Sequence, residues 1–338
     1  MLLRNRQKIA NLHTQTQGVD MRVDANAIQD ITDLDTNHSK LTFLWLELTR
    51  QCNLECTHCY EESDPRLPLL GSMATKDWIR VLTEAANLGV EFVDFIGGEP
   101  TLHPDIGLLI ATATELGINV GIYTNGTTIK NELWNVLAQN NVRMAFSYYA
   151  TKAEIHDVVT TRQGSHQKTR AAIIRAVELG LQVRVGVIEI PGVNDDTIEA
   201  TIAQIRALGV KNVGSDRMRG FGRGVVSLDA IRDPFKELCG ACGNTKMAID
   251  YNGDVYPCVF SKFTQLGNVN TGLSILAEGA TMQRFLERLN VEHPERATDG
   301  ECGPDCRPRG SCRPDCSPTD KCQPYYDRRC EPQKDCSP

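Results

Sequence analysis

The sequence predicts an α/β protein in which a partial, TIM-like (β/α)6 barrel precedes a small cysteine-rich region. Apolar segments of strand length alternate with amphipathic segments of helical spacing across residues 41–225. Several of the amphipathic segments end at a glycine, which is a common C-terminal stop of helices. After about residue 225 the alternation ends and cysteines accumulate. These observations indicate a sheet of parallel strands followed by a second, smaller unit.

The barrel is expected to open with strand 41–49, a nearly continuous apolar run, followed by helix 75–88. Four strand–helix pairs then follow in order: 92–96 with 104–116, 119–123 with 131–139, 142–148 with 165–179, and 182–190 with 195–208. A sixth strand is expected at 210–218. Continuous apolar runs are typical of parallel strands that are covered on both faces. Six units, fewer than the eight of a closed barrel, predict an open barrel, with a doubly wound sheet as the alternative.

The segments that flank the barrel differ from it in composition. Residues 1–40 form a polar arm without a clear period. Residues 226–338 form the auxiliary region, and its last part, 299–338, holds seven Cys and seven Pro but no Leu, Ile, Val, Phe, Met, Trp or Ala. Such a segment cannot bury enough apolar surface to offset its ordering entropy. It is therefore either disordered or held by metal or disulfides.

Composition excludes several classes of protein. The 338 residues exceed the usual size of one domain. The formal net charge of −7 provides no basic footprint for nucleic acid. No run of eighteen apolar residues could span a membrane, and the first residues lack the apolar core of a signal peptide. We therefore expect a cytoplasmic protein, in which thirteen Cys indicate metal ligands rather than disulfides.

Three cysteines directly follow the first predicted strand: Cys52, Cys56 and Cys59. In β/α folds the chemistry lies at this C-terminal end of the strands. Three thiolates hold an iron–sulfur cube and leave one iron open. The alternative is a structural zinc site with His58 as the fourth ligand, although zinc sites favour paired cysteines with a second pair elsewhere.

The second predicted strand ends in Gly97-Gly98-Glu99-Pro100. The glycines allow a ligand to approach the backbone closely, and Glu99 adds a carboxylate that can hold an ammonium group. The alternative is an ordinary turn.

CxxxCxxC after the first strand and GGEP after the second resemble the radical S-adenosylmethionine (SAM) enzymes, over roughly residues 41–225. The resemblance implies a partial (β/α)6 barrel in which Cys52, Cys56 and Cys59 ligate a 4Fe–4S cluster whose open iron binds SAM. An electron from the cluster would cleave SAM to a 5′-deoxyadenosyl radical that abstracts hydrogen from an unactivated C–H bond.

The resemblance also implies SAM-binding residues at the strand ends: Gly97, Gly98, Glu99, Thr124, Asn125, Ser147 and Ile188. Many peptide-modifying members read Ser-Leu-Asp-Gly at the fourth strand, whereas this chain reads Ser147-Tyr148-Tyr149-Ala150. Arg217 ends the sixth strand, where a guanidinium could hold a carboxylate of SAM or substrate. The alternatives are ordinary strand ends, a core strand and a solvated basic loop.

The C-terminal cysteines resemble the SPASM extension of peptide-modifying radical SAM enzymes. Asn252-Gly253 predicts a hairpin turn between 246–251 and 254–257, which returns Cys258 beside Cys242. The resemblance implies one auxiliary cluster on Cys239, Cys242, Cys258 and Cys316. A second would use Cys302, Cys306, Cys312 and one of Cys322, Cys330 or Cys336, taken here as Cys330. Zinc sites or disulfides are the alternatives. Two cysteines then remain unassigned. They could form a disulfide, have no role, donate a hydrogen atom or act as a substrate-linked ligand.

The sequence therefore predicts a radical SAM enzyme with SAM and three 4Fe–4S clusters, one SAM-binding and two auxiliary. The resemblance implies C–H chemistry on a ribosomally made precursor peptide, with an electron donor of the flavodoxin or ferredoxin type. Because the 40-residue arm is short for a leader-binding domain, a separate leader-binding protein is a further candidate partner. The alternatives are a small-molecule radical SAM epimerase, dehydrogenase or decarboxylase acting on a sugar or aminoglycoside, and a non-catalytic iron–sulfur protein.

Overall fold

The computed structural model describes residues 41–225 and 232–294. Six parallel strands form the barrel part of its sheet: β1 Phe43–Thr49, β2 Phe92–Gly97, β3 Asn119–Thr124, β4 Arg143–Tyr148, β5 Val183–Glu189 and β6 Asn212–Arg217. Within the described residues the sheet order is β6-β5-β4-β3-β2-β1-β7-β8-β9, so each barrel strand lies beside its neighbour in sequence. A doubly wound sheet would instead reverse its strand order at a switch point. The observed order confirms the partial barrel.

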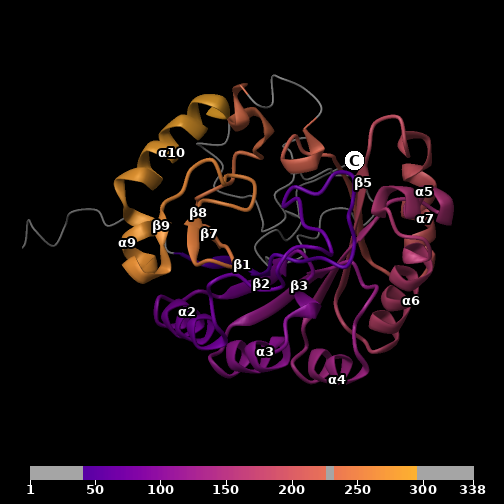
Figure 1. Cartoon of the computed structure of the whole chain (residues 1–338), viewed down its shortest axis with the longest axis horizontal. Helices are drawn as coiled ribbons and strands as arrows, with labels where there is room; N and C mark the ends of the chain where they lie inside the picture. Colours follow the sequence, from indigo (N-terminus) through magenta and orange to yellow (C-terminus); the bar gives the residue numbers. More distant parts are fainter. Residues whose placement is uncertain (1–40, 226–231, 295–338) are drawn as a thin grey trace, which may run out of the picture. The chain divides into compact units, whose positions relative to one another are not determined.

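Helices follow the strands in alternation: α2 Thr75–Asn87, α3 Ile106–Glu115, α4 Asn131–Gln139, α5 Ala153–Thr160, α6 Ser165–Glu178 and α7 Ile198–Ala207. Short 3-10 turns lie between them: η1 Pro100–Leu102, η2 Asp195–Thr197, η3 Gly222–Gly224, η4 Pro234–Glu237 and η5 Val269–Thr271. In Figure 1 the helices form an arc outside the strands. Right-handed crossovers between neighbouring parallel strands place successive helices on the same side. The inner side of the arc is therefore left for functional side chains.

Most of these elements lie where the sequence predicts them, and α4 has the predicted bounds. The expected helix 195–208 begins as the turn η2 and continues as α7. The sequence does not predict α5, which is only eight residues long and buries the polar side chains of His156 and Thr160. This short helix matters, because it lies against the cysteines that follow β1.

Strand β1 is buried along its whole length and carries one charged side chain. Leu44, Leu46 and Leu48 are at most 1% exposed and share one face. Glu47 and Thr49, on the opposite face, are fully buried as well. A carboxyl group in such a position requires polar partners, because burying an unpaired charge is costly.

The region after the barrel extends the same sheet. Strand β7, Lys246–Ile249, pairs in parallel with β1, and β8, Asp254–Tyr256, returns antiparallel to β7, which confirms the predicted hairpin. Strand β9, Gly267–Asn268, and helices α9, Leu273–Glu278, and α10, Ala280–Glu292, follow. Figure 1 shows β7 and β8 beside β1. The hairpin therefore brings cysteines far along the chain to the strand that precedes the first cysteine group.

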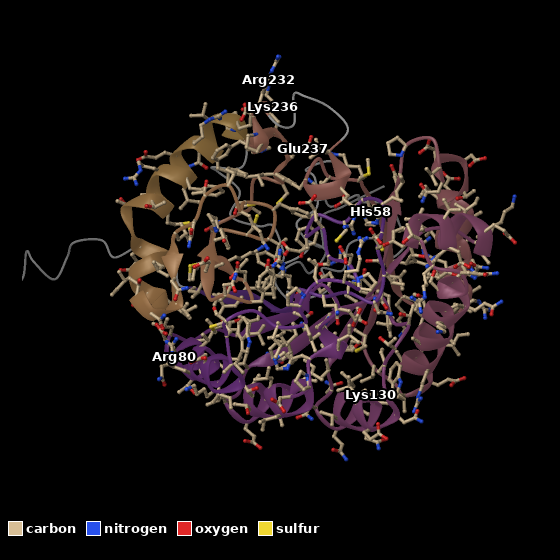
Figure 2. The ribbon with its side chains drawn as sticks, in the orientation of Figure 1. His58, Arg80, Lys130, Arg232, Lys236 and Glu237 are labelled. Atoms are coloured by element: carbon tan, nitrogen blue, oxygen red, sulfur yellow. The ribbon has the colours of Figure 1, made fainter. Side chains whose placement is uncertain are left out.

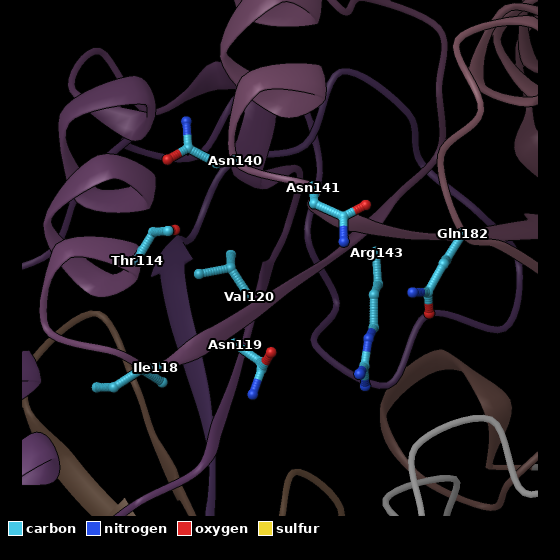
Figure 3. A pocket seen from close by; sticks show the side chains of 8 residues that line it. All are labelled: Thr114, Ile118, Asn119, Val120, Asn140, Asn141, Arg143 and Gln182. Atoms are coloured by element: carbon cyan, nitrogen blue, oxygen red, sulfur yellow. The ribbon is translucent and has the colours of Figure 1, made fainter.

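A polar pocket lies near the N-terminal ends of β3, β4 and β5 and is lined by Thr114, Ile118, Asn119, Val120, Asn140, Asn141, Arg143 and Gln182 (Figure 3). It is at the opposite end of the strands from the predicted site. Among the described residues, no helix combines the length and the apolar character needed to cross a membrane.

Candidate functional site

The first cysteine group forms a loop, residues 52–59, at the C-terminal end of β1; we call it the cysteine loop. Cys52 is buried, and Cys56 and Cys59 are half-buried. Helix α5 holds the loop through two backbone hydrogen bonds, in which Thr57 donates to Val159 over 2.9 Å and Glu55 to Thr160 over 3.4 Å. The loop therefore has fixed support from the barrel wall.

The two glycines of the GGEP turn pack against the start of the cysteine loop. A Cβ atom on Gly97 would lie 2.5 Å from the carbonyl oxygen of Thr49, and one on Gly98 would lie 2.2 Å from that of Gln51. The backbone N–H of Gly98 donates to Thr49 over 2.8 Å, and that of Glu99 donates to Gln51 over 3.0 Å. The glycines are therefore required by contacts within the chain, in addition to any ligand.

Glu99 joins the ends of β2 and β3. Its carboxylate is 1% exposed and accepts four hydrogen bonds. Oε1 accepts from the Thr101 backbone over 3.1 Å, the Thr101 hydroxyl over 2.6 Å and the Thr124 hydroxyl over 2.7 Å, and Oε2 accepts from the Asn125 backbone over 2.8 Å. Burial raises the pKa of Glu99, and these donors oppose the rise. Oε2, with a single donor, keeps capacity for a cationic ligand.

Asn125 connects this carboxylate to the cysteine loop. Its Nδ2 donates to Asn53 over 2.9 Å and lies 3.6 Å from the Cys52 sulfur. Asn53 in turn donates to the Thr127 hydroxyl over 2.7 Å. The structure therefore brings Cys52, Glu99, Thr124 and Asn125 together, as predicted.

The thiols of the cysteine loop are chemically suited to a cationic centre. Burial raises the pKa of all three thiols, and that of Cys56 reaches about 12. Such thiols ionise only when a strong positive charge binds them, and coordinating iron or zinc supplies that charge. Burial lowers the pKa of His58 to about 4, so its imidazole is neutral. Among residues 41–225 and 232–294, no three His, Cys, Asp or Glu side chains converge into a ready site for a single metal ion.

The turn η3, which follows β6, contributes Arg223, which is not among the predicted site residues. Its Nε donates to the carbonyl of Cys56 over 2.8 Å, and its Nη2 donates to Ser63 over 2.7 Å. Arg217 instead pairs with Glu237 over 2.7 Å and is 45% exposed. In Figure 2 His58 lies inside the arc, whereas Arg80 extends outward from α2. Arg223 therefore holds the cysteine loop, whereas Arg217, which was predicted to hold a carboxylate of SAM or substrate, pairs with Glu237 in this structure.

The fourth strand contributes Ser147, which is half-buried. It hydrogen-bonds the hydroxyl of Tyr149, whose pKa is raised well above its usual value by burial and by Cys56. Ile188 on β5 packs against a small apolar cluster that includes Tyr149 and Val159. Of this cluster, Val159 belongs to α5 and Tyr149 approaches the sulfur of Cys56.

Pairwise contacts link three cysteines of the auxiliary region, Cys239, Cys242 and Cys258, which we call the auxiliary cage. All are buried, and Cys242 contacts both of the others, with 2.8 Å between its sulfur and that of Cys258. Ser261 closes the turn by accepting from the Cys258 backbone N–H over 2.8 Å. The remaining predicted ligands, Cys302, Cys306, Cys312, Cys316 and Cys330, lie outside the described residues.

An ionic bridge joins the barrel to the segment that follows the auxiliary cage. Lys262, four residues after Cys258, contacts the carboxylate of Glu47 over 2.6 Å and also that of Glu61. Burial, and secondly Glu61, raises the pKa of Glu47 to about 8, although Lys262 opposes the rise. The phenol of Tyr60 lies 3.5 Å from Glu47, and its ring packs against Phe260. The signal for this bridge was the single Glu within the apolar first strand.

Comparison with known proteins agrees with this geometry. The model of the radical SAM superfamily matches residues 46–205, and that of the SPASM iron–sulfur cluster-binding domain matches residues 239–313. The subtilosin biosynthesis protein AlbA of Bacillus subtilis is 29% identical over 66% of this chain and 56% of its own length. GTP 3′,8-cyclase of Aquifex aeolicus is 30% identical over 60% of this chain and 67% of its own length.

Among solved structures, SuiB of Streptococcus suis bound to its precursor peptide SuiA superposes with a TM-score of 0.63. It is 18% identical, over 77% of this chain and 70% of SuiB, so it supports the fold alone. The chain spans between 21% and 67% of the length of the curated relatives compared with it, and 56% of AlbA. Because the superfamily match covers both motif-bearing strand ends and a 30% identical relative is matched over two thirds of its length, this chain belongs to the radical SAM superfamily and carries a SPASM iron–sulfur cluster-binding domain.

Proposed function

We propose that this chain reductively cleaves SAM and uses the resulting radical to modify a ribosomally made precursor peptide. The observation that carries the proposal is the joining of three sites. Asn125 links the Glu99 carboxylate to the cysteine loop by hydrogen bonds, and Lys262, four residues after Cys258 of the auxiliary cage, contacts Glu47 of β1. An electron carrier needs cysteines but no carboxylate-organised turn beside them.

In this proposal Cys52, Cys56 and Cys59 hold the first 4Fe–4S cluster, and their three thiolates leave one iron for SAM. The bound cluster and SAM supply the electron and the 5′-deoxyadenosyl radical that removes hydrogen from the substrate. The chain's own residues position the reactants. Glu99 holds the ammonium of SAM at Oε2, and Asn125 and Arg223 keep the cysteine loop in place.

Thr124, Ser147 and Ile188 complete the SAM pocket in the proposal, together with the backbone of Gly97 and Gly98. The contact of Arg217 with Glu237 makes it a weaker candidate for SAM, and a substrate carboxylate could still compete for it at the surface. Water exclusion is favoured by the burial of Cys52 and Glu99.

The auxiliary region would hold two further clusters, giving three in all. Cys239, Cys242 and Cys258 would share one with Cys316, while Cys302, Cys306, Cys312 and Cys330 would hold the other. Four thiolates per cluster leave no open iron, so these clusters would transfer electrons rather than bind SAM. A flavodoxin- or ferredoxin-type protein in the cytoplasm would supply electrons, and a separate protein could present the peptide leader.

Iron content tests the cofactor part of the proposal. After anaerobic reconstitution we expect about twelve iron per chain, from three clusters of four. Replacing Cys52, Cys56 and Cys59 together by Ala should leave about eight iron and abolish release of 5′-deoxyadenosine. A triple variant that still cleaves SAM would contradict the assignment of these three cysteines. Zinc in place of iron in the reconstituted protein would contradict the proposed iron–sulfur clusters.

Substrate class is tested with peptides encoded beside this chain. The reduced enzyme, SAM and each peptide are incubated in H2O and in D2O, and the peptides are analysed by mass spectrometry. A cross-link appears as the loss of two hydrogens, and an epimerisation as uptake of one solvent deuterium. The similarity to AlbA favours a peptide. The similarity to GTP 3′,8-cyclase supports the second candidate, a small-molecule substrate. This candidate is favoured if nucleotides or sugars accelerate SAM cleavage and peptides do not.

A further inference from the structure

The hydroxyl group of Tyr149 faces the cysteine loop. Tyr149 directly follows β4, is 4% exposed, and places its hydroxyl oxygen 4.0 Å from the sulfur of Cys56. Ser147 hydrogen-bonds the same hydroxyl group. In this contact the Tyr149 hydroxyl is the donor and the sulfur of Cys56 is the acceptor.

Neighbouring residues hold the Tyr149 ring in this orientation. His58 and His156 pack edge-on against it, at ring-centroid distances of 5.2 and 5.0 Å. The carbonyl oxygen of Tyr149 accepts a hydrogen bond from Asn194 over 2.7 Å. Two side chains and a backbone hydrogen bond therefore hold the ring.

Cys56 is held equally firmly. Its carbonyl accepts from Arg223 over 2.8 Å, and the next residue, Thr57, donates from its backbone to Val159 over 2.9 Å. Since both partners are anchored to different elements, their approach follows from the fold rather than from one flexible side chain.

We propose that Tyr149 is a positioning residue that donates a hydrogen bond to the Cys56 thiolate and thereby raises the reduction potential of the SAM-binding cluster. This rests on the proposed function, in which Cys56 is a cluster ligand. A donor to a ligand sulfur stabilises the more negative, reduced state of the cluster. Tyr149 offers this donor at the position where the resemblance would place an Asp.

The neighbouring tyrosine provides a matched control. Tyr148 is fully buried, and its hydroxyl pairs with Nε2 of His166 over 2.7 Å rather than with the cysteine loop. Tyr149→Phe and Tyr148→Phe each remove one buried hydroxyl from adjacent positions and keep the ring. Only the first change removes the contact with Cys56.

The test is a potentiometric titration of the reconstituted full-length protein, followed by the EPR signal that changes when SAM is added. We expect Tyr149→Phe to lower the ratio of reduced to oxidised cluster about tenfold at a fixed applied potential, equivalent to about 59 mV for one electron. Tyr148→Phe should leave the potential unchanged. An unchanged potential in Tyr149→Phe, or equal shifts in both variants, would overturn the proposal.

A second measurement applies if Tyr149→Phe fails to hold iron. Site-specific incorporation of a fluorinated tyrosine at position 149 keeps the ring and makes the hydroxyl a stronger donor, so the potential should rise. A potential that does not rise would contradict the role of Tyr149. Failure of the proposed function is distinguishable, because the wild-type protein would then lack any cluster signal that responds to SAM.

Discussion

Replacing Glu99 by Gln should loosen the end of β3 that carries Asn125. The carboxylate accepts three hydrogen bonds at Oε1 and one at Oε2. An amide has one oxygen and one NH2 group of nearly the same shape. If its oxygen takes the place of Oε1, its NH2 group faces the backbone N–H of Asn125, and two donors oppose each other.

The cost can be worked from these contacts. A buried donor without an acceptor costs about 1–3 kcal/mol, and the other hydrogen bonds lose the charge that strengthens them. Relief from burying a charge offsets part of this loss, since burial raises the pKa of Glu99. We expect a net loss of about 2 kcal/mol, equivalent to roughly thirtyfold more frequent local opening.

Amide hydrogen exchange of the anaerobic holoprotein measures this opening directly. The peptide that carries Asn125 should lose protection in Glu99→Gln, and SAM should bind more weakly. Glu115→Gln is the control, because Glu115 is exposed at the end of α3. If protection around Asn125 is the same in both variants, the carboxylate does not organise the two strand ends and our reasoning is wrong.

Three other changes test separate parts of the structure. Because folding raises the pKa of Glu47 from 4.5 to about 8, the folded protein holds this proton more tightly than the unfolded chain, and the resulting stability is lost as the pH rises towards 8. Chemical denaturation should therefore show that the free energy of unfolding falls by about 2 kcal/mol between pH 6 and pH 8. The Glu47→Gln variant should not show this fall. Gly98→Ala should lower iron content by about four per chain, because its Cβ meets the Gln51 carbonyl at 2.2 Å, whereas Gly107→Ala, with its nearest neighbour at 3.6 Å, should not. Cys316→Ala should change the EPR signal of the cluster on the auxiliary cage; unchanged auxiliary signals would mean different ligation.

Local patterns in the sequence predict the barrel and its motif-bearing ends. Apolar runs, helical spacing and terminal glycines are properties of short segments, so α4 is found at its predicted bounds. Helix α5 escaped the prediction because it is short and buries polar residues such as His156, which pattern analysis assigns to the surface. The pairing of β7 with β1 could not be predicted, since about 200 residues separate the paired strands and no local signal specifies a parallel neighbour at that distance.

The same limit applies to the site. Cys52 and Glu99 were predicted because each follows a strand, and parallel strands end at one edge of the sheet, whereas Asn125 was implied by the resemblance to radical SAM enzymes. The roles of Arg223 and Lys262 depend on contacts across more than 150 residues, so neither charge had a partner visible in sequence. Gly98 was predicted as a site residue because a glycine lets a ligand approach the backbone. The structure adds a second reason, because a Cβ atom at this position would lie 2.2 Å from the carbonyl oxygen of Gln51.

The supports of the cysteine loop come from different parts of the barrel, and this has a consequence for how substitutions act. Asn125 follows β3, Val159 belongs to α5 and Arg223 follows β6. One hydrogen bond contributes about 1 kcal/mol, which is small beside the stability of a domain. Loss of one support should therefore leave the fold intact while shifting the position or potential of the bound cluster. Because each support belongs to a separate element, effects on the cluster should add where supports do not touch and depart from additivity only for contacting pairs, such as Asn125 with Glu99.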